Sequence, residues 1–253
     1  MIIEIIPCLT DNYSYLLCDE ISNTVGIIDP SEFVICDKII DKKHKKLDFI
    51  LNTHHHYDHV GGNEKLKNKY NSTVLGFEDD RNRIPSIDKV LKDGQEVKIG
   101  ALKFTTIFIP GHTKGHVAFY FKKEKVLFTG DTLFSLGCGR VFEGTYEQMF
   151  QSLNKLKNFP NDTKIYCGHE YTYKNLEFCL KFNPNNIFLK KKKDVIELCL
   201  KNKIPTVPST IDEEIKTNIF LRFSDPDVKK ALNLINSSDI EIFTKLRDLK
   251  DNF

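Results

Sequence analysis

Seven residues, 53–59 with the sequence THHHYDH, constrain this chain more than any other stretch. The apolar residues Leu47, Phe49, Ile50 and Leu51 before them predict a buried strand, and the two glycines that follow predict the entry to a helix. If the stretch is extended, the alternation of side chains places His54, His56 and Asp58 on the same side. The cluster is then expected at the C-terminal end of a strand, where open α/β sheets bind their ligands.

The residue types in this cluster are those that bind metal ions. Imidazole nitrogens and carboxylate oxygens coordinate zinc, iron or manganese at about 2 Å. The cluster contains no cysteine, which disfavours a closed, cysteine-rich structural zinc site. A solvated histidine-rich loop is the alternative for an isolated pair of histidines, but Asp58 and His59 complete an HxHxDH pattern and favour the metal site.

Three further stretches place a possible ligand directly after an apolar strand. They contribute His112 in IPGHTKGH, Asp131 in FTGDT and His169 in IYCGHEY. A carboxylate is the side chain best able to bridge two cations. Asp29 lies in the stretch IIDP, where a predicted strand ends in a turn. The sequence leaves two interpretations of this residue open. It is either a hydrogen-bond partner of a metal-bound histidine or an acceptor for its own turn.

Composition limits the class of protein. A chain of 253 residues with 40% hydrophobic residues can form one large domain, or one domain with an appendage. A net charge of +2 argues against a nucleic-acid binder, and the run 190–193 (KKKK) is interpreted as a solvated helix face rather than a patch for an anionic partner. Seven scattered cysteines without a CxxC pair favour reduced thiols. No apolar run is long enough for a membrane helix and no basic start precedes one, so a cytoplasmic location is expected.

Short β-rich runs and turns fill the chain to about residue 172, and two sheets with helices outside them would account for this order. The strands are predicted at 2–6, 13–18, 24–28, 48–52, 73–77, 102–108, 117–121, 125–129 and 164–167, and helices at 62–70 and 145–157. The tail from about 173 is lysine-rich, poor in glycine and helical in its spacing. Its capping boxes Thr210–Glu213 and Ser238–Glu241 predict two helix starts. Two stripes with helical spacing are predicted to be packing surfaces, and they are formed by Val195, Leu198, Cys199 and Asn202, and by Leu232, Leu234 and Ile235.

The stretches THHHYDH, GHTKGH, GDTLF and GHEYT, in this order, resemble the metallo-β-lactamase superfamily. Within it, GCGRVFEGT at 137–145 and the tail stretches PSTIDEE and NIFLR resemble glyoxalase II, the hydroxyacylglutathione hydrolases. The resemblance implies an α+β fold, a four-layer αβ/βα sandwich over residues 1–172 followed by a helical, glutathione-thioester-binding domain over 173–253.

The resemblance also implies two divalent metal ions, with zinc expected first and iron or manganese as alternatives. One ion would be held by His54, His56 and His112, and the other by Asp58, His59 and His169. Asp131 would bridge the two ions and Asp58 would orient the nucleophile. His55 and His116 match no ligand position and are assigned to structural roles.

The activity implied is hydrolysis of S-D-lactoylglutathione and related 2-hydroxyacyl thioesters to D-lactate and glutathione, by hydroxide held between the metals, as the second step of methylglyoxal detoxification. The protein would be a monomer or weak homodimer with no nucleic-acid or membrane partner. The residues at the family's substrate positions are Arg140, Tyr171, Arg247 and Lys250. Two positions depart from the family, which usually has lysine where this chain has Arg140 and tyrosine where it has Phe142.

Three rival functions follow from the same residues. A persulfide dioxygenase shares the fold and several ligands, but the roughly 80-residue helical tail disfavours it. Lactonases, lactamases and RNA-processing nucleases of the superfamily are disfavoured by GCGRVFEGT. A nucleic-acid-binding module using 190–193 would bind RNA or DNA in a salt-sensitive way, and the full ligand set argues against it.

Overall fold

The computed structural model describes all residues from 1 to 253 and divides them into two compact units. The first unit contains Met1–Phe108 and Lys114–Gly130, and the second contains Ile109–Thr113 and Asp131–Phe253. The short loop that carries His112 therefore belongs to the second unit. The predicted domain boundary after residue 172 stays a prediction.

The first unit contains a six-stranded mixed sheet. In order across the sheet its strands are β1 (Ile2–Cys8), β2 (Asn12–Asp19), β3 (Thr24–Ile28), β4 (Phe49–Leu51), β5 (Thr73–Phe77) and β6 (Lys89–Leu91). The first three strands are antiparallel, and β3, β4, β5 and β6 run parallel. All three residues of β4 are buried, as their apolar sequence predicts. The parallel strands end at one edge, and the THHHYDH stretch begins there.

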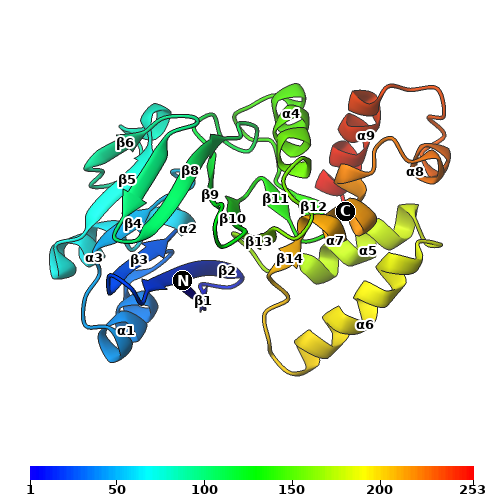
Figure 1. Cartoon of the computed structure of the whole chain (residues 1–253). Helices are drawn as coiled ribbons and strands as arrows, with labels where there is room; N and C mark the ends of the chain where they lie inside the picture. Colours follow the sequence, from blue (N-terminus) through cyan, green and yellow to red (C-terminus); the bar gives the residue numbers. More distant parts are fainter. The chain divides into compact units, whose positions relative to one another are not determined.

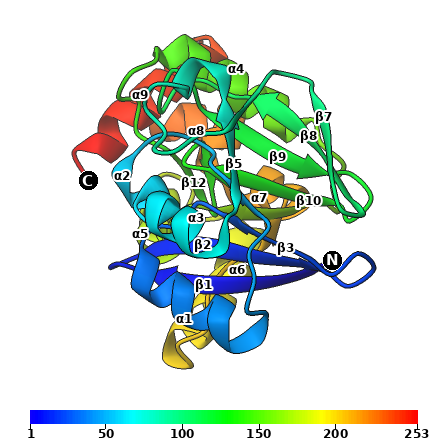
Figure 2. The same ribbon diagram turned by 90° about the vertical axis from the view of Figure 1, so that its left-hand side faces the viewer.

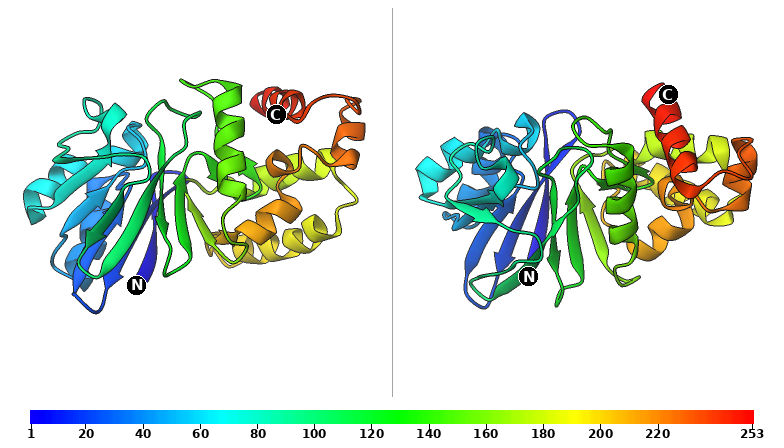
Figure 3. Two further views of the ribbon diagram at one scale, coloured as in Figure 1. Left: turned by 45° about the horizontal axis from the view of Figure 1, so that its top comes forward. Right: turned by 90° about the horizontal axis from the view of Figure 1, so that it is seen from above.

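Four further strands of this unit form an antiparallel arrangement. They are β7 (Glu96–Ile99), β8 (Leu102–Phe108), β9 (Val117–Phe121) and β10 (Val126–Gly130). Aromatic contacts join them to the first sheet, since the rings of Tyr15 and Phe128 lie 5.2 Å apart and those of Phe77 and Phe108 lie 4.8 Å apart. The blue strands of the first sheet and the green strands β8, β9 and β10 lie against each other in Figure 3. The two sheets thus share one apolar interior.

Helices cover the other face of the first sheet. They are α1 (Phe33–Lys43), the short α2 (Tyr57–Val60) and α3 (Asn63–Tyr70), with a 3-10 turn η1 (Glu78–Asp80) after β5. In Figure 1 α1 and α3 lie on the left of the strands, and Figure 2, which shows that side, has them in front of the strands. A continuous apolar cluster joins α1 and α3 to the sheet, and it includes Ile6, Ile27, Cys36, Ile40 and Leu66. Helix α1 was not predicted from the sequence. Its N-cap residue, Glu32, makes no side-chain capping hydrogen bond and is not a typical N-cap residue type.

The second unit is mainly helical. Its elements are β11 (Leu133–Phe134), β12 (Gly137–Cys138), α4 (Tyr146–Lys157), β13 (Lys164–Cys167), α5 (Thr172–Phe182), α6 (Ile187–Lys201), β14 (Ser209–Thr210), α7 (Ile211–Thr217), η2 (Ile219–Leu221), α8 (Pro226–Ala231) and α9 (Asp239–Asp251). The strands β11 and β12 form a hairpin, and β13 pairs with β14. Phe243 of α9 lies within 5.9 Å of Phe150 of α4, ring to ring, so α9 packs beside α4 (Figure 3). None of the helices has the length and hydropathy that crossing a membrane requires.

The capping-box predictions in the tail are confirmed. Thr210 is the N-cap of α7 and pairs reciprocally with Glu213, and Ser238 is the N-cap of α9 and pairs with Glu241. In each box the glutamate carboxylate accepts from the backbone N–H of the N-cap residue. In both cases the four-residue capping-box pattern therefore predicted where the helix begins.

Both predicted packing stripes in the tail are wrong. Val195 and Leu198 face solvent with exposed fractions of 55% and 60%, while α6 buries Leu189 and Ile196 instead. Residues 232–235 follow the end of α8 and form no helix, and Ile235 is exposed. Spacing of three and four residues identified a helix in the first case, but it did not identify the face that packs.

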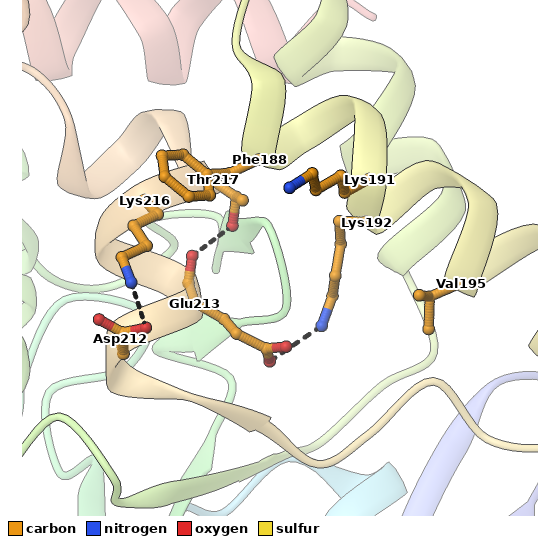
Figure 4. Close-up of a pocket in the computed structure, with 8 residues that line it drawn as sticks. All are labelled: Phe188, Lys191, Lys192, Val195, Asp212, Glu213, Lys216 and Thr217. Atoms are coloured by element: carbon orange, nitrogen blue, oxygen red, sulfur yellow. Dashed lines mark hydrogen bonds and ion pairs between the residues drawn. The ribbon is translucent and has the colours of Figure 1, made fainter.

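A cavity of about 230 Å³ lies between α6 and α7 (Figure 4). Lys192 of α6 pairs with Glu213 of α7 across it at 3.0 Å, and Lys216 pairs with Asp212 within α7 at 2.5 Å. Within the run 190–193, Lys192 is thus tied to α7 and the other three lysines are exposed, which agrees with a solvated helix face. No residue predicted for the site lines this cavity.

Candidate metal centre

The first unit gathers four of the predicted ligands at the end of β4. The ring of His54 lies 4.7 Å from that of His56 and 4.2 Å from that of His59, centroid to centroid. His59 Nε2 lies 3.5 Å from Asp58 Oδ2. His54 and His59 are fully buried, and His56 and Asp58 are partly exposed. We call these four residues the first half-site.

The condition that residues 54–58 are extended fails at Tyr57, where a helix begins. His56 is the N-cap of α2, and the chain is helical from Tyr57, so Asp58 and His59 lie in a helical turn. The turn is fixed by backbone bonds, from His59 N to His56 O at 2.9 Å and from Gly62 N to Pro30 O at 2.8 Å. A helical turn at this point brings both Asp58 and His59 into the half-site, which strict alternation could not do.

Asp29 supports the first half-site, which decides between its two interpretations. Its Oδ2 lies 3.0 Å from His59 Nδ1 and accepts from Thr53 Oγ1 at 2.6 Å, and its Oδ1 accepts from Thr53 N at 2.8 Å. Thr53 Oγ1 in turn lies 3.1 Å from His54 Nδ1. One carboxylate therefore orients two histidines.

Asn12 is a site residue that the sequence reasoning missed. It lies at the start of β2, and its Nδ2 donates to Asp58 Oδ2 at 2.8 Å and to Asp58 O at 3.2 Å. The contact joins residues 46 positions apart, and no local pattern around Asn12 signals it. Its effect is to fix the carboxylate of Asp58.

His55 and His116 lie beside the half-site, and the structure gives each a packing contact. His55 Nδ1 lies 3.3 Å from Asp80 Oδ2, and Arg83 Nη1 lies 3.3 Å from His55 Nε2. His116 stacks on His54, with ring centroids 4.6 Å apart. Gly130 has φ of 47°, and a Cβ there would lie 2.7 Å from the His116 ring, so this position of the GDT stretch requires glycine.

The second unit gathers the other three predicted ligands. His112, Asp131 and His169 lie in loops after β8, β10 and β13. Asp131 Oδ2 lies 3.1 Å from His169 Nε2 and 3.5 Å from His112 Nε2. We call these three residues the second half-site. One carboxylate oxygen of Asp131 thus lies close to both imidazoles.

Tyr171 and Arg140 adjoin the second half-site. Tyr171 stacks on His169 with centroids 4.7 Å apart and rings nearly parallel. The side chain of Arg140 is 57% exposed, with its guanidinium 5.6 Å from the ring of Phe142 and Nε 3.6 Å from Asp251 Oδ2. Phe142 is exposed and lies 5.2 Å from His112, ring to ring. The two residues that depart from the family pattern therefore lie together, next to a predicted metal ligand.

The two basic residues of α9 are more buried than their predicted role suggests. Arg247 is 4% exposed, and it donates from Nη1 to Cys138 O at 2.7 Å and from Nη2 to Asp251 Oδ1 at 2.9 Å. Lys250 Nζ donates to Lys174 O at 3.2 Å. Burial and the neighbouring Arg247 lower the pKa of Lys250. Asp251 contacts both arginines and links α9 to the loop after β12.

The donor chemistry of the half-sites fits divalent metal ions. A metal-binding histidine usually has its second ring nitrogen against a protein oxygen, which orients the ring. His59 Nδ1 faces Asp29, His54 Nδ1 faces Thr53, and His112 Nδ1 lies 2.7 Å from Arg140 O. In all three rings these contacts engage Nδ1, so Nε2 is the nitrogen that would face a metal ion. Imidazole and carboxylate donors without thiolate suit zinc, iron and manganese.

Comparison with known proteins covers both parts of the chain. Residues 10–169 match the model of the metallo-beta-lactamase superfamily, and residues 170–253 match that of the hydroxyacylglutathione hydrolase C-terminus. A hydroxyacylglutathione hydrolase of Pelagibacter ubique (strain HTCC1062) is 51% identical over 253 residues, 100% of each chain. One from Methylococcus capsulatus is 44% identical and covers 98% of this chain and 97% of its own.

Solved structures agree on the fold. ETHE1 from Myxococcus xanthus superimposes with a TM-score of 0.68 at 23% identity, over 98% of this chain and 97% of that one. The BLEG-1 B3 metallo-beta-lactamase gives 0.67 at 22% identity, over 87% of this chain and 99% of that one. The predicted α+β metallo-β-lactamase fold with a C-terminal helical domain is confirmed. The chain belongs to the hydroxyacylglutathione hydrolase family of the metallo-β-lactamase superfamily.

Proposed function

We propose that this chain hydrolyses S-D-lactoylglutathione and related 2-hydroxyacyl glutathione thioesters to the free acid and glutathione. The observation that carries the proposal is the full-length similarity to hydroxyacylglutathione hydrolases, 51% identity over the whole of both chains. It extends over both half-sites and over the C-terminal segment that carries Arg247 and Lys250. Location in the cytoplasm and a monomer or weak homodimer belong to the same proposal.

The proposed metal site combines both half-sites. His54, His56 and His112 would hold one divalent ion, Asp58, His59 and His169 would hold the other, and Asp131 would serve both. When bound, such ions act as Lewis acids toward water and toward a carbonyl oxygen. Zinc is the first metal to test, and iron and manganese have the same donor preferences here.

The residues of the chain supply orientation and proton handling. Asp58, with its carboxylate fixed by Asn12 at 2.8 Å, orients the attacking water toward the thioester carbonyl carbon and takes its proton. The leaving group is a thiolate, and because the pKa of a thiol is about 8.5 it departs without a strong general acid. Arg140, Tyr171, Arg247 and Lys250 bind the glutathione moiety, whose two carboxylates suit cationic donors.

The experiment that tests this function measures thiol release from S-D-lactoylglutathione with bound metal counted on the same sample. Wild-type protein with about two metal ions is expected to release thiol, and His56→Ala to lose the activity. His44→Ala is the matched control, because His44 ends α1 and lies outside both half-sites. Fully metallated wild-type protein that releases no thiol would overturn the proposal, and oxygen uptake with glutathione persulfide would replace it with a dioxygenase.

A further inference from the structure

The tail stretches PSTIDEE and NIFLR take no direct part in the proposed chemistry, and they place a buried acid next to the β11–β12 hairpin. Glu214 of α7 is fully buried. Its Oε2 accepts from Leu136 N at 2.8 Å and from Asn218 Nδ2 at 3.0 Å. Burial raises the pKa of this carboxyl, while the contact with Leu136 N opposes the shift. Burying a carboxyl group costs free energy, and hydrogen bonds to the group offset that cost.

The structure that these bonds hold is the hairpin turn at Ser135 and Leu136. Leu136 has φ of 60°, in the left-handed region that costs a non-glycine residue free energy. Its N–H donates to Glu214, and its carbonyl accepts from Cys179 Sγ at 3.2 Å. The carboxylate therefore stabilises a backbone conformation that leucine alone disfavours.

Two asparagines also hold the backbone of the hairpin, and we call them, together with Glu214, the clamp. Asn218 Nδ2 donates to Gly137 O at 3.0 Å, and Asn175 Nδ2 donates to Ser135 O at 3.1 Å. The clamp thus consists of side chains from α5, from α7 and from the residue before η2, and Figure 1 shows α5 and α7 beside the hairpin. The backbone of the hairpin is held by the helical part of the second unit.

The two ends of the hairpin lead into the second half-site. Asp131 lies two residues before β11, and Gly139 follows β12 directly. Gly139 N donates to Thr132 O at 3.1 Å, and a Cβ at Gly139 would lie 1.8 Å from Asp131 O. The next carbonyl, that of Arg140, contacts His112 Nδ1 at 2.7 Å. A shift of the hairpin would therefore move Asp131 and release the contact that orients His112.

We propose that Glu214 is a positioning residue for the metal site, acting through the β11–β12 hairpin on Asp131 and His112. This inference rests on the proposed function only in taking those two residues as metal ligands. In this proposal, the PSTIDEE stretch fixes the hairpin backbone and thereby the positions of Asp131 and His112. The family resemblance alone gave this glutamate no role.

The test measures metal affinity directly, by competition with a chromophoric zinc chelator at a temperature well below unfolding. Glu214→Ala is expected to weaken zinc binding at least about tenfold, since loss of groups that orient metal ligands costs 10- to 100-fold. Glu214→Gln is expected to stay within about threefold of wild type, because its amide oxygen can still accept from Leu136 N. Ile196→Ala is the matched control, since it removes a fully buried side chain of α6 and lowers stability without touching the hairpin.

The outcomes separate the inference from the proposed function. If folded Glu214→Ala binds zinc as wild type does, or if Ile196→Ala weakens binding as much, Glu214 is merely structural and the inference fails, while thiol release by wild type still supports the function. Wild-type protein that binds no zinc, iron or manganese would overturn both. If Glu214→Ala does not fold, Glu214→Asp serves, because its shorter side chain cannot reach Leu136 N and Asn218 at once, and unchanged affinity in that variant also overturns the inference.

Discussion

The carboxylate of Asp29 contacts His59 of the first half-site and two groups of Thr53 beside it, and its replacement should change metal binding. In Asp29→Asn an amide NH₂ would face the donors of Thr53 or His59, so one of these contacts becomes repulsive. We expect metal affinity to fall about 10- to 100-fold, with a matching loss of bound metal after dialysis. The measurement is metal content against chelator concentration.

Asp19→Asn is the control for Asp29→Asn. Asp19 is also buried in the first unit, and it accepts from Ile21 N and Ala101 N, far from the half-site in sequence and in contacts. We expect this variant to lose stability and to keep wild-type metal affinity. If Asp29→Asn retained metal as well as Asp19→Asn, the orienting role of Asp29 would be refuted.

The two arginines proposed for glutathione binding should respond differently to truncation. Arg140→Ala removes an exposed side chain. We expect KM for S-D-lactoylglutathione to rise about tenfold, because the substrate would lose one charge-assisted hydrogen bond. Arg247→Ala also breaks a buried pair with Asp251, so about 3 kcal/mol of unfolding free energy should be lost as well. Steady-state kinetics and urea denaturation measure the two effects.

The control for both arginine variants is Arg81→Ala, an exposed arginine after η1. A small thioester without glutathione provides the second comparison. If either variant lost as much activity on the small thioester as on the glutathione thioester, its assignment to glutathione binding would be wrong.

The helices and strands show where sequence patterns suffice. The apolar runs predicted β1 to β5, β8 to β10 and β13 because a strand buried on one or both faces leaves a signal within its own residues. The turn into α2 at Tyr57 was not predictable, because backbone bonds to His56 and to Pro30 decide it. The buried face of α6 was not predictable either, because its partners decide which side chains pack.

The capping box of α9 yields a pH dependence. Hydrogen bonds from the Ser238 side chain and backbone lower the pKa of Glu241. A lowered folded-state pKa means that the carboxylate stabilises the fold above the ordinary glutamate pKa of about 4.3, and that this contribution disappears as pH falls through the folded-state value. We therefore expect Glu241→Ala to lower the melting temperature of metal-free protein at pH 6, and this effect to become smaller as the pH is lowered to 3.

Lys245→Ala, an exposed change on the same helix, is the control for this pH dependence. Its effect on the melting temperature should be small at pH 6 and should not follow the titration of Glu241. A difference between Glu241→Ala and wild type that persisted unchanged to pH 3 would contradict the prediction. Since α9 carries Arg247 and Lys250, the same box stabilises the helix that presents them.

The complete ligand set draws on the whole chain. The first half-site is compact in sequence, so its four ligands were readable from HxHxDH, whereas His112, Asp131 and His169 became candidates only through their shared place after strands. The residues that orient the ligands, Asn12 and Glu214, were not found, because each acts across many positions of sequence. Ligands are thus more predictable than the groups that hold them.

Because the proposed ligands include residues of both units, we expect bound metal to stabilise the folded chain as a whole. A ligand that binds only the folded state adds about 4 kcal/mol when it is present at 1,000 times its Kd. We expect removal of metal by a chelator to lower the melting temperature, and zinc to restore it, with two ions bound at saturation. His56→Ala and Asp29→Asn should recover less on adding zinc, and His44→Ala should recover fully. Full recovery of the melting temperature with one ion per chain would contradict the binuclear site. A melting temperature that does not change with metal would mean that the half-sites do not share ions.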